Sequence, residues 1–190
     1  MSSHFTVVYD ACVLYSQTLR DLLMRLALTD LFRARWTRRI HDEWTCNLIA
    51  KRPDLAPSRI YRVRDLMDAH VRDALVEDYE HLIPAIALPD PNDAHVVAAA
   101  VQCRAELIVT FNQKDFPPDA LRNYNVAAQH PDDFIADLFD LNQAKVLEAM
   151  AAHRQSLKNP PKSIDEYLTA LLGLGLTQSV SVVRPYSIAI

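Results

Sequence analysis

Short apolar runs rich in β-branched residues, separated by segments with helical periodicity, constrain the fold of this chain most strongly. The first run covers residues 5–9 and a second covers residues 107–110, and residues 33–36 and 125–128 are further candidates for short strands. A short run that is apolar on both faces is typical of a strand in the middle of a parallel sheet. Strands that alternate with helices indicate right-handed crossovers, so the sequence predicts an α/β fold.

The segments between these runs carry apolar residues at helical spacing. This spacing predicts helices over residues 19–26, 37–50, 58–71, 93–104 and 131–141, with an extended piece near residue 75 and a helical turn over residues 79–83. Thr37 and Asn92 are good N-cap residues, and Pro131 takes the favoured first-turn position. Asn92 would place Asp93 in the first turn of its helix, with Asp90 just outside it.

The last fifty residues have a different pattern. Residues 142–157 are helical, Asn159-Pro160-Pro161 forms a linker, and Ser163 with Glu166 makes a capping box that opens another helix. The tail from Thr177 is β-branched, which is compatible with a strand or an extended arm. We therefore predict a main domain over residues 1–140, followed by a helical C-terminal extension and tail over residues 141–190.

The composition of the 190 residues is that of a globular protein, because half of them are hydrophobic. No apolar run approaches the roughly 20 residues of a membrane span, and the start of the chain lacks the pattern of a signal peptide. The three cysteines have no CxxC spacing. They indicate reduced, mostly buried thiols in a cytoplasmic protein and argue against a zinc site.

The net charge of −4 argues weakly against broad nucleic-acid affinity, but the charge is unevenly distributed. Residues 1–75 hold 12 basic and 9 acidic side chains, whereas the remainder holds 8 and 15. Arg33, Arg35, Arg38 and Arg39 account for part of the basic excess. They form either solvated surfaces, which is the commoner case, or a rim that contacts phosphates.

Four acidic residues, Asp10, Glu43, Asp93 and Asp115, each lie beside a different apolar element. An aspartate after a strand is often a turn former, and one at a helix N-terminus is often a cap. In a doubly wound sheet, however, the carboxyl ends of the strands and the following helix N-termini meet at one edge. Carboxylates gathered there repel one another unless a cation lies among them, and hard oxygen ligands suit Mg²⁺ or Mn²⁺.

The neighbours of Glu43 follow the same helical pattern. Glu43 precedes Trp44 at the border of the apolar stripe, so its side chain is expected to point along the edge of the core toward a shared site. His41 and Asp42 are expected at the surface.

Four segments in this order resemble a known family. They are residues 7–14, 36–44, 90–100 and 108–117, and together they cover about residues 5–135. The chain resembles PIN-domain proteins of the VapC-like toxin kind. The resemblance implies a three-layer α/β/α fold with a central parallel sheet of four to five strands. It also implies a metal-dependent endoribonuclease that uses Mg²⁺ or Mn²⁺ to hydrolyse RNA phosphodiester bonds with an activated water.

The site residues implied by the resemblance follow from position. Asp10 matches the first acid of the family, Glu43 the second and Asp93 the third. The family often has an aspartate two residues after the strand-ending threonine, here Thr110, and this chain has Asn112 there. The implied metal ligands are therefore Asp10, Asp93, Glu43 and Asn112, and Asp115 is an alternative fourth catalytic acid.

Two further expectations follow from the resemblance. Cys12 stands where the family commonly has a small hydroxyl residue, and Thr110 is placed to hydrogen-bond a carboxylate. Family members usually pair with a small antitoxin and often form homodimers, so RNA, an antitoxin and a second copy are the expected partners.

Other functions remain open on the sequence. Asn112 and Cys12 are compatible with a catalytically weak PIN module that binds RNA or protein. A haloacid-dehalogenase-like phosphatase also has an aspartate after its first strand, but it needs a second aspartate where Cys12 stands. His41-Asp42 is similar to the pair of all-helical metal phosphohydrolases, and the strand before Asp10 argues against that class.

Overall fold

The centre of the molecule is a sheet of four parallel strands. The structure, a computed structural model, describes residues 5–190. The strands are β1 (Thr6–Tyr9), β2 (Arg33–Arg35), β3 (Leu107–Val109) and β4 (Ala127–Gln129), in the order β2-β1-β3-β4. In register, Val7 of β1 pairs with Ala34 on one side and Leu107 on the other. The predicted parallel sheet is therefore confirmed, and β1 lies inside it.

Helices surround this sheet. They are α1 (Ala11–Tyr15), α2 (Gln17–Ala27), α3 (Arg38–Lys51), α4 (Pro57–His70), α5 (Ala94–Gln102), α6 (Pro118–Leu121), α7 (Pro131–Leu141), α8 (Gln143–Ser156), α9 (Ile164–Leu172) and α10 (Thr177–Val183). Short 3-10 turns cover Glu80–Ala85, Pro91–Asp93, Gln113–Asp115, Arg122–Tyr124 and Arg184–Ala189.

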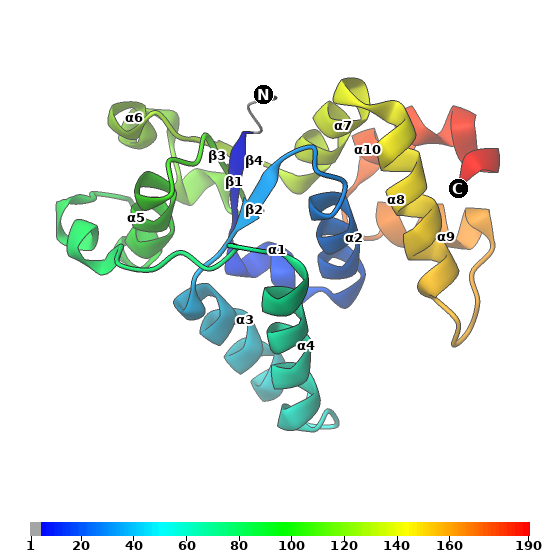
Figure 1. Cartoon of the computed structure of the whole chain (residues 1–190), viewed down its shortest axis with the longest axis horizontal. Helices are drawn as coiled ribbons and strands as arrows, with labels where there is room; N and C mark the ends of the chain where they lie inside the picture. The colour runs from blue at the N-terminus through cyan, green and yellow to red at the C-terminus, as the bar shows by residue number, and fades with distance from the viewer. Residues whose placement is uncertain (1–4) are drawn as a thin grey trace.

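The arrangement has three layers. In Figure 1, α5 lies on one side of the strands, and α2 and α7 lie on the other. Helix α5 packs on β1 and β3, and its run from Val96 to Ala100 is fully buried. Removing this apolar surface from water is the main favourable term in holding α5 against the sheet. The three-layer α/β/α fold implied by the resemblance is confirmed.

Helices α1, α3 and α4 lie below the carboxyl end of β1 (Figure 1). Helix α1 packs on α3, and α3 packs on α4. The predicted cap is present, because the Thr37 hydroxyl accepts a hydrogen bond from the Ile40 amide at 3.1 Å. The chain after α4 returns to the sheet as an extended piece, where Leu75 bridges Trp36. These elements place α3 beside the strand end from which Asp10 emerges.

His41 on α3 is buried, so the prediction of a surface position was wrong. Its side chain is 1% exposed and links two tryptophans through hydrogen bonds. His41 Nε2 lies 2.9 Å from Asp68 Oδ1, which also accepts a bond from Trp36 Nε1, and Trp44 Nε1 donates to His41 Nδ1 at 3.0 Å. A buried imidazole is tolerated when its polar atoms are paired in this way. Burial lowers the pKa of His41, although Asp68 acts in the opposite direction.

The C-terminal helices cover the side of the molecule that carries α2. Helix α8 packs on α2, and α10 packs on α7. The predicted capping box is present, because Ser163 Oγ accepts from the Glu166 amide and Glu166 Oε2 accepts from the Ser163 amide. The tail from Thr177 forms α10 and a 3-10 turn, so the expectation of a strand or an extended arm was wrong.

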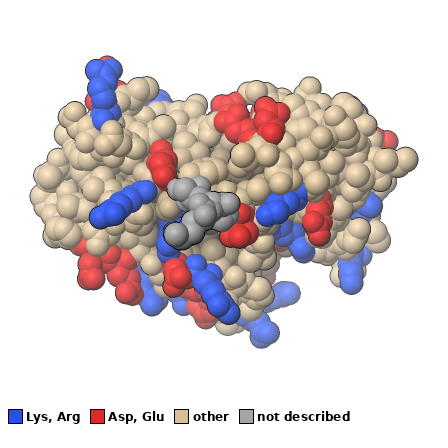
Figure 2. Space-filling model, turned by 45° about the horizontal axis from the view of Figure 1, so that its top comes forward, with Lys and Arg blue, Asp and Glu red and all other residues tan. Residues whose placement is uncertain are grey.

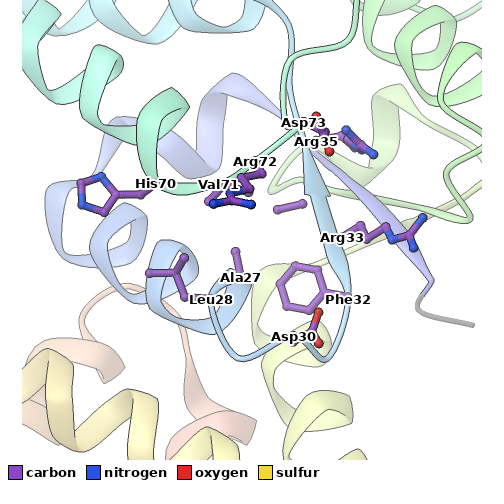
Figure 3. A pocket seen from close by; sticks show the side chains of 11 residues that line it. Ala27, Leu28, Asp30, Phe32, Arg33, Arg35, His70, Val71, Arg72 and Asp73 are labelled. Atoms are coloured by element: carbon purple, nitrogen blue, oxygen red, sulfur yellow. The ribbon is translucent and has the colours of Figure 1, made fainter. Parts of the chain in front are cut away.

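The outer edge of β2 borders a cavity of about 430 Å³ (Figure 3). Arg33 and Arg35 lie on one side of this strand, and Ala27, Leu28 and His70 lie on the other. Arg33 is also at the amino end of its strand, paired with Thr6, so it lies far from the strand ends that carry the acids. The four arginines of the sequence analysis therefore do not form one rim around the acids.

Within residues 5–190, no helix is long and apolar enough to cross a membrane. On the described part of the face shown in Figure 2, basic and acidic side chains are interspersed without a continuous basic patch.

Candidate active site

Three of the predicted acids line one cavity of about 420 Å³ at the carboxyl end of β1. We call it the acidic cavity. Asp10 follows β1, Glu43 comes from α3, and Asp93 immediately precedes α5. Parallel strands bring these segments together because their carboxyl ends share one edge. The cavity is lined by Asp10, Ala11, Cys12, Tyr15, Glu43, Trp44, Asn47, Lys51, Asn92, Asp93 and Asn112.

Asp10 is held by three hydrogen bonds and is 6% exposed. Its Oδ1 accepts from the Ala11 amide at 2.6 Å, which caps α1. Its Oδ2 accepts from Thr110 Oγ1 at 2.7 Å and from Cys12 Sγ at 3.0 Å. The contact predicted for Thr110 is therefore confirmed. Because Thr110 directly follows β3, the pairing of β1 with β3 determines where this carboxylate lies.

Cys12 takes the place of a hydroxyl group beside Asp10. Besides donating to Asp10, its sulfur accepts a bond from the Phe111 amide at 3.2 Å. Burial and the negative charge of Asp10 raise the pKa of the Cys12 thiol to about 12, so the thiol stays protonated near neutral pH. All three cysteines are free thiols, as expected, but Cys46 is exposed and Cys12 and Cys103 are only partly buried.

Asp93 carries an unfavourable negative charge. Burial raises its pKa to about 6, with further contributions from the charges of Asp10, Asp90 and Asp115. Capping does not account for its position, because within the described chain its side chain accepts no capping bond from α5. The expected N-cap Asn92 was also wrong, since Asp90 Oδ1 caps this turn by accepting from the Asn92 amide at 2.9 Å. A carboxylate destabilised in this way favours a nearby cation.

Glu43 connects α3 to α5. Its Oε1 lies 2.9 Å from His95 Nε2 and 3.4 Å from Arg39 Nε. The buried His95 is within ion-pair distance of this oxygen, but its ring nitrogens do not meet hydrogen-bond geometry. A small rotation of the His95 ring would align the two groups and leave them in contact. Arg39 also donates to the Asn92 carbonyl, so this arginine ties Glu43 to the turn before α5.

Asn112 and Asp115 occupy different places. Asn112 lines the acidic cavity, and its backbone amide donates to Thr110 Oγ1 at 2.9 Å. Asp115 does not line this cavity; it ends the 3-10 turn after β3 and contributes to the site through its charge on Asp93. Asp115, the acidic residue closest in sequence to Asn112, is thus not part of the cavity wall.

The donor set of the cavity fits a hard divalent ion. Asp10 and Asp93 offer carboxylate oxygens, and Asn112 offers an amide oxygen. Among residues 5–190 no three His, Cys, Asp or Glu side chains are positioned to hold an ion on their own. This is compatible with Mg²⁺, which proteins usually bind through one or two carboxylates while water fills the other positions.

Several cavity residues were not predicted from the sequence. Asn47 and Lys51 follow Glu43 at intervals of four along α3, so helical spacing alone was enough to place them on the same face. Tyr15, at the end of α1, and the buried His95, which contacts Glu43 but does not line the cavity, gave no comparable signal, because both depend on how α1, α3 and α5 pack.

A second cavity adjoins the acidic one. It has a volume of about 870 Å³ and lies between α1–α2 and α3–α4. Its wall is mixed: Leu48, Val63 and Leu66 are apolar, and the arginines Arg20, Arg52, Arg59 and Arg62 also line it. Tyr15 and Trp44 line both cavities.

Comparison with known proteins agrees with this architecture. Residues 6–114 match the PIN domain family, and residues 131–185 match the VapC50 C-terminal domain family. A stretch of 79 residues is 44% identical to a Mycobacterium tuberculosis protein named "Putative ribonuclease VapC50". This stretch covers 42% of the chain and 47% of that relative, so the chain spans about half the length of the curated relative it matches. No solved structure matches the chain. Since the PIN match covers more than half of the residues and includes Asp10, Glu43, Asp93 and Asn112, the chain belongs to the PIN-domain family.

Proposed function

We propose that this protein is a divalent-metal-dependent endoribonuclease that hydrolyses RNA phosphodiester bonds, and that it is the toxin of a toxin–antitoxin pair. Membership of the PIN family and the similarity to a protein named as a ribonuclease support the reaction class. The observation that carries the proposal is the acidic cavity, which Asp10, Glu43 and Asp93 line together and in which the pKa of Asp93 is raised to about 6.

In this proposal Asp10 and Asp93 hold the ion, Mg²⁺ or Mn²⁺. When bound, such an ion supplies an activated water and offsets negative charge on the phosphoryl oxygen. Thr110 and Cys12 fix the Asp10 carboxylate through their hydrogen bonds to Oδ2. Asn112 presents its amide to the same cavity. We assign Asn112 as an additional ligand and Asp115 as an acid that acts only through its charge.

We assign Glu43 to the attacking water. It lines the cavity, and His95 and Arg39 hold its Oε1 on the side of α5. From there its carboxylate would accept a hydrogen bond from the attacking water and orient it toward phosphorus. In the alternative role, Glu43 would contact the ion through a water molecule. Positioning a nucleophile in this way removes part of the entropic barrier of the reaction.

The test is cleavage of a labelled single-stranded RNA with Mg²⁺, with Mn²⁺ and with a chelator. We expect cleavage only with the divalent ions. Asp10→Asn and Asp93→Asn are each expected to lower the rate at least about 100-fold, since losing an ion ligand removes several kcal/mol of transition-state stabilisation. Glu77→Gln, which changes an exposed acid outside the cavity, is the matched control and is expected to keep full activity.

Two outcomes would contradict the proposal. Unchanged cleavage in both aspartate variants would remove the carboxylate site. Metal-independent RNA binding without cleavage would instead favour a catalytically weak binding module, the alternative that Asn112 leaves open.

We also propose a small cognate antitoxin, a homodimeric state and a cytoplasmic location. The similarity to the VapC50 C-terminal domain and to the VapC50 protein supports the antitoxin partner. A short reading frame beside this one that encodes a DNA-binding protein is the observation expected for such a pair.

A further inference from the structure

One face of α3 changes from acidic to basic along the acidic cavity. Glu43, Asn47 and Lys51 are spaced four residues apart, so they follow one another on consecutive turns of the same face. All three line the acidic cavity. Among the described residues that line it, Lys51 is the only basic one. The cavity therefore has an acidic part, lined by Asp10, Glu43 and Asp93, and a cationic end at Lys51.

The Lys51 ammonium is held at the cavity without an acidic partner. Its Nζ lies 5.4 Å from the centre of the Tyr15 ring, an arrangement that favours a cation. Within residues 5–190, no carboxylate forms an ion pair with it. The neighbouring Arg52 differs, because its guanidinium is paired with Asp54 at 2.7 Å. Lys51 thus keeps its donors available for an anion that enters the cavity.

The spacing along α3 indicates which anion Lys51 meets. A helix rises about 1.5 Å per residue, so the backbone of Lys51 lies roughly 12 Å beyond that of Glu43. A phosphate held at the acidic end is too far along the helix to be the main partner of Lys51. A strand that continues from that point along α3 brings a neighbouring phosphate to the ammonium. Single-stranded nucleic acids are commonly held by such cationic groups combined with aromatic rings.

We propose that Lys51 binds a phosphate that flanks the cleaved one on the RNA strand, and that Tyr15 is a positioning residue for Lys51. This inference rests on the proposed ribonuclease function, and it adds the direction of the substrate, which runs from the acidic end along α3. It also explains how an acidic cavity attracts a polyanion, since Lys51 supplies the attraction that the carboxylates lack.

The test compares Lys51→Ala, Lys51→Arg and the control Lys158→Ala, which removes an exposed lysine from the segment between α8 and α9. Binding of a short fluorescein-labelled single-stranded RNA is followed by anisotropy over a range of salt concentrations, in an Asp10→Asn background that prevents cleavage. Lys51→Ala is expected to weaken binding about tenfold at low salt, because one charge-assisted contact is lost. It should also reduce the slope of log K against log salt by about 0.7, the value for one phosphate of a single strand.

Kinetics in the otherwise unchanged protein separate binding from chemistry. Lys51→Ala is expected to raise KM about tenfold with little change in kcat, and Lys51→Arg should restore KM. Tyr15→Ala should raise KM by a smaller factor, Tyr15→Phe should not, and Tyr15→Ala should have no further effect once Lys51 is alanine. If Tyr15 had only a structural role, Tyr15→Ala would raise KM by the same factor in the wild-type protein and in Lys51→Ala.

The outcomes are distinguishable. If the wild-type protein cleaves RNA and Lys51→Ala matches it in KM and in salt slope, the Lys51 assignment is overturned while the ribonuclease stands. A fall in kcat at unchanged KM overturns it as well. The wild-type protein could instead fail to cleave RNA, while Lys51→Ala still reduces the slope of log K against log salt for RNA binding by about 0.7. That result would support the phosphate site and contradict the nuclease.

Discussion

Asp93 gives the clearest link between one residue and the behaviour of the whole protein. Its pKa in the folded protein, about 6, is above the ordinary value of 3.8, first because of burial and then because of neighbouring carboxylates. The folded state therefore binds more protons than the unfolded state between about pH 4 and 6. The contribution of Asp93 to stability in the absence of metal therefore falls as the pH rises through this interval.

A prediction follows for Asp93→Asn without metal. At pH 8 the variant is expected to melt a few degrees higher than the wild-type protein, because the substitution removes a repelled charge. At pH 4 the two should melt together, since Asp93 is then protonated. Thermal unfolding followed by circular dichroism in a chelator measures both, with Glu77→Gln as the control. A lower melting temperature at pH 8 would show that the Asp93 charge is stabilising.

The residues of the site differ in how far the sequence predicted them. Asp10 and Thr110 directly follow strands, so the strand pattern alone placed them at the same edge. His41 was misplaced because its burial depends on Asp68, which is 27 residues away in the chain. Periodicity assigns a residue to a helix face, but it does not reveal a polar partner on another helix.

At the scale of elements, one buried carboxylate accepts most of the hydrogen bonds that attach α10 to α7. Asp132 is 4% exposed and accepts bonds from the amides of Gln178 and Ser179, each at 2.8 Å, and from the hydroxyls of Ser179 and Thr177. Burial acts to raise the pKa of Asp132, but these hydrogen bonds outweigh it and the pKa is lowered. Asp132 thus satisfies first-turn amides of α10 from a distant part of the chain.

Asp132→Ala is expected to cost about 2 kcal/mol of unfolding free energy at pH 7, the upper range for a lost cap. Because the folded pKa is lowered, this contribution is present above the ordinary pKa and is lost as the pH falls below about 4. Urea unfolding at pH 7 and pH 3 measures the difference. Asp140→Ala, an exposed acid on the same helix, should change stability by less than about 0.5 kcal/mol. Equal effects of the two variants would contradict this role.

The same contacts explain why the tail was not predicted as a helix. Thr177, Val180, Val182 and Val183 have β propensity, and the sequence before them gives no cap. Tertiary packing overrides the propensity, because Asp132 supplies the cap and Val180 and Val183 are buried one turn apart. The capping box of α9, by contrast, lies within four residues and was predictable.

At the scale of the molecule, the parallel sheet and its layers followed from the alternation of apolar runs and helical segments. The sequence did not predict where the C-terminal helices pack on the rest of the molecule. The buried residues form one continuous cluster that includes Leu22 of α2, Phe134 of α7 and Met150 of α8. The predicted boundary after residue 140 falls before the last residue of α7, and α7 and α8 both contribute to this cluster. The boundary stays a prediction.

Truncation tests that boundary. A chain that ends at residue 141 loses α8 and α10, which cover α2 and α7, so it is expected to expose apolar surface and to lose cooperative unfolding. Dye binding to exposed apolar surface and near-ultraviolet circular dichroism measure this. A truncated chain that unfolds cooperatively at the temperature of the full chain would identify residues 141–190 as an independent unit.

Trp44 lines both the acidic cavity and the larger cavity beside it, and it is 1% exposed. One consequence concerns inhibitors. Small molecules that imitate a phosphate must carry charge, which limits their passage into cells. A neutral compound bound among Leu48, Val63 and Leu66 would lie beside Trp44 and Tyr15, the two residues that also line the acidic cavity, so it would act on that cavity without resembling RNA.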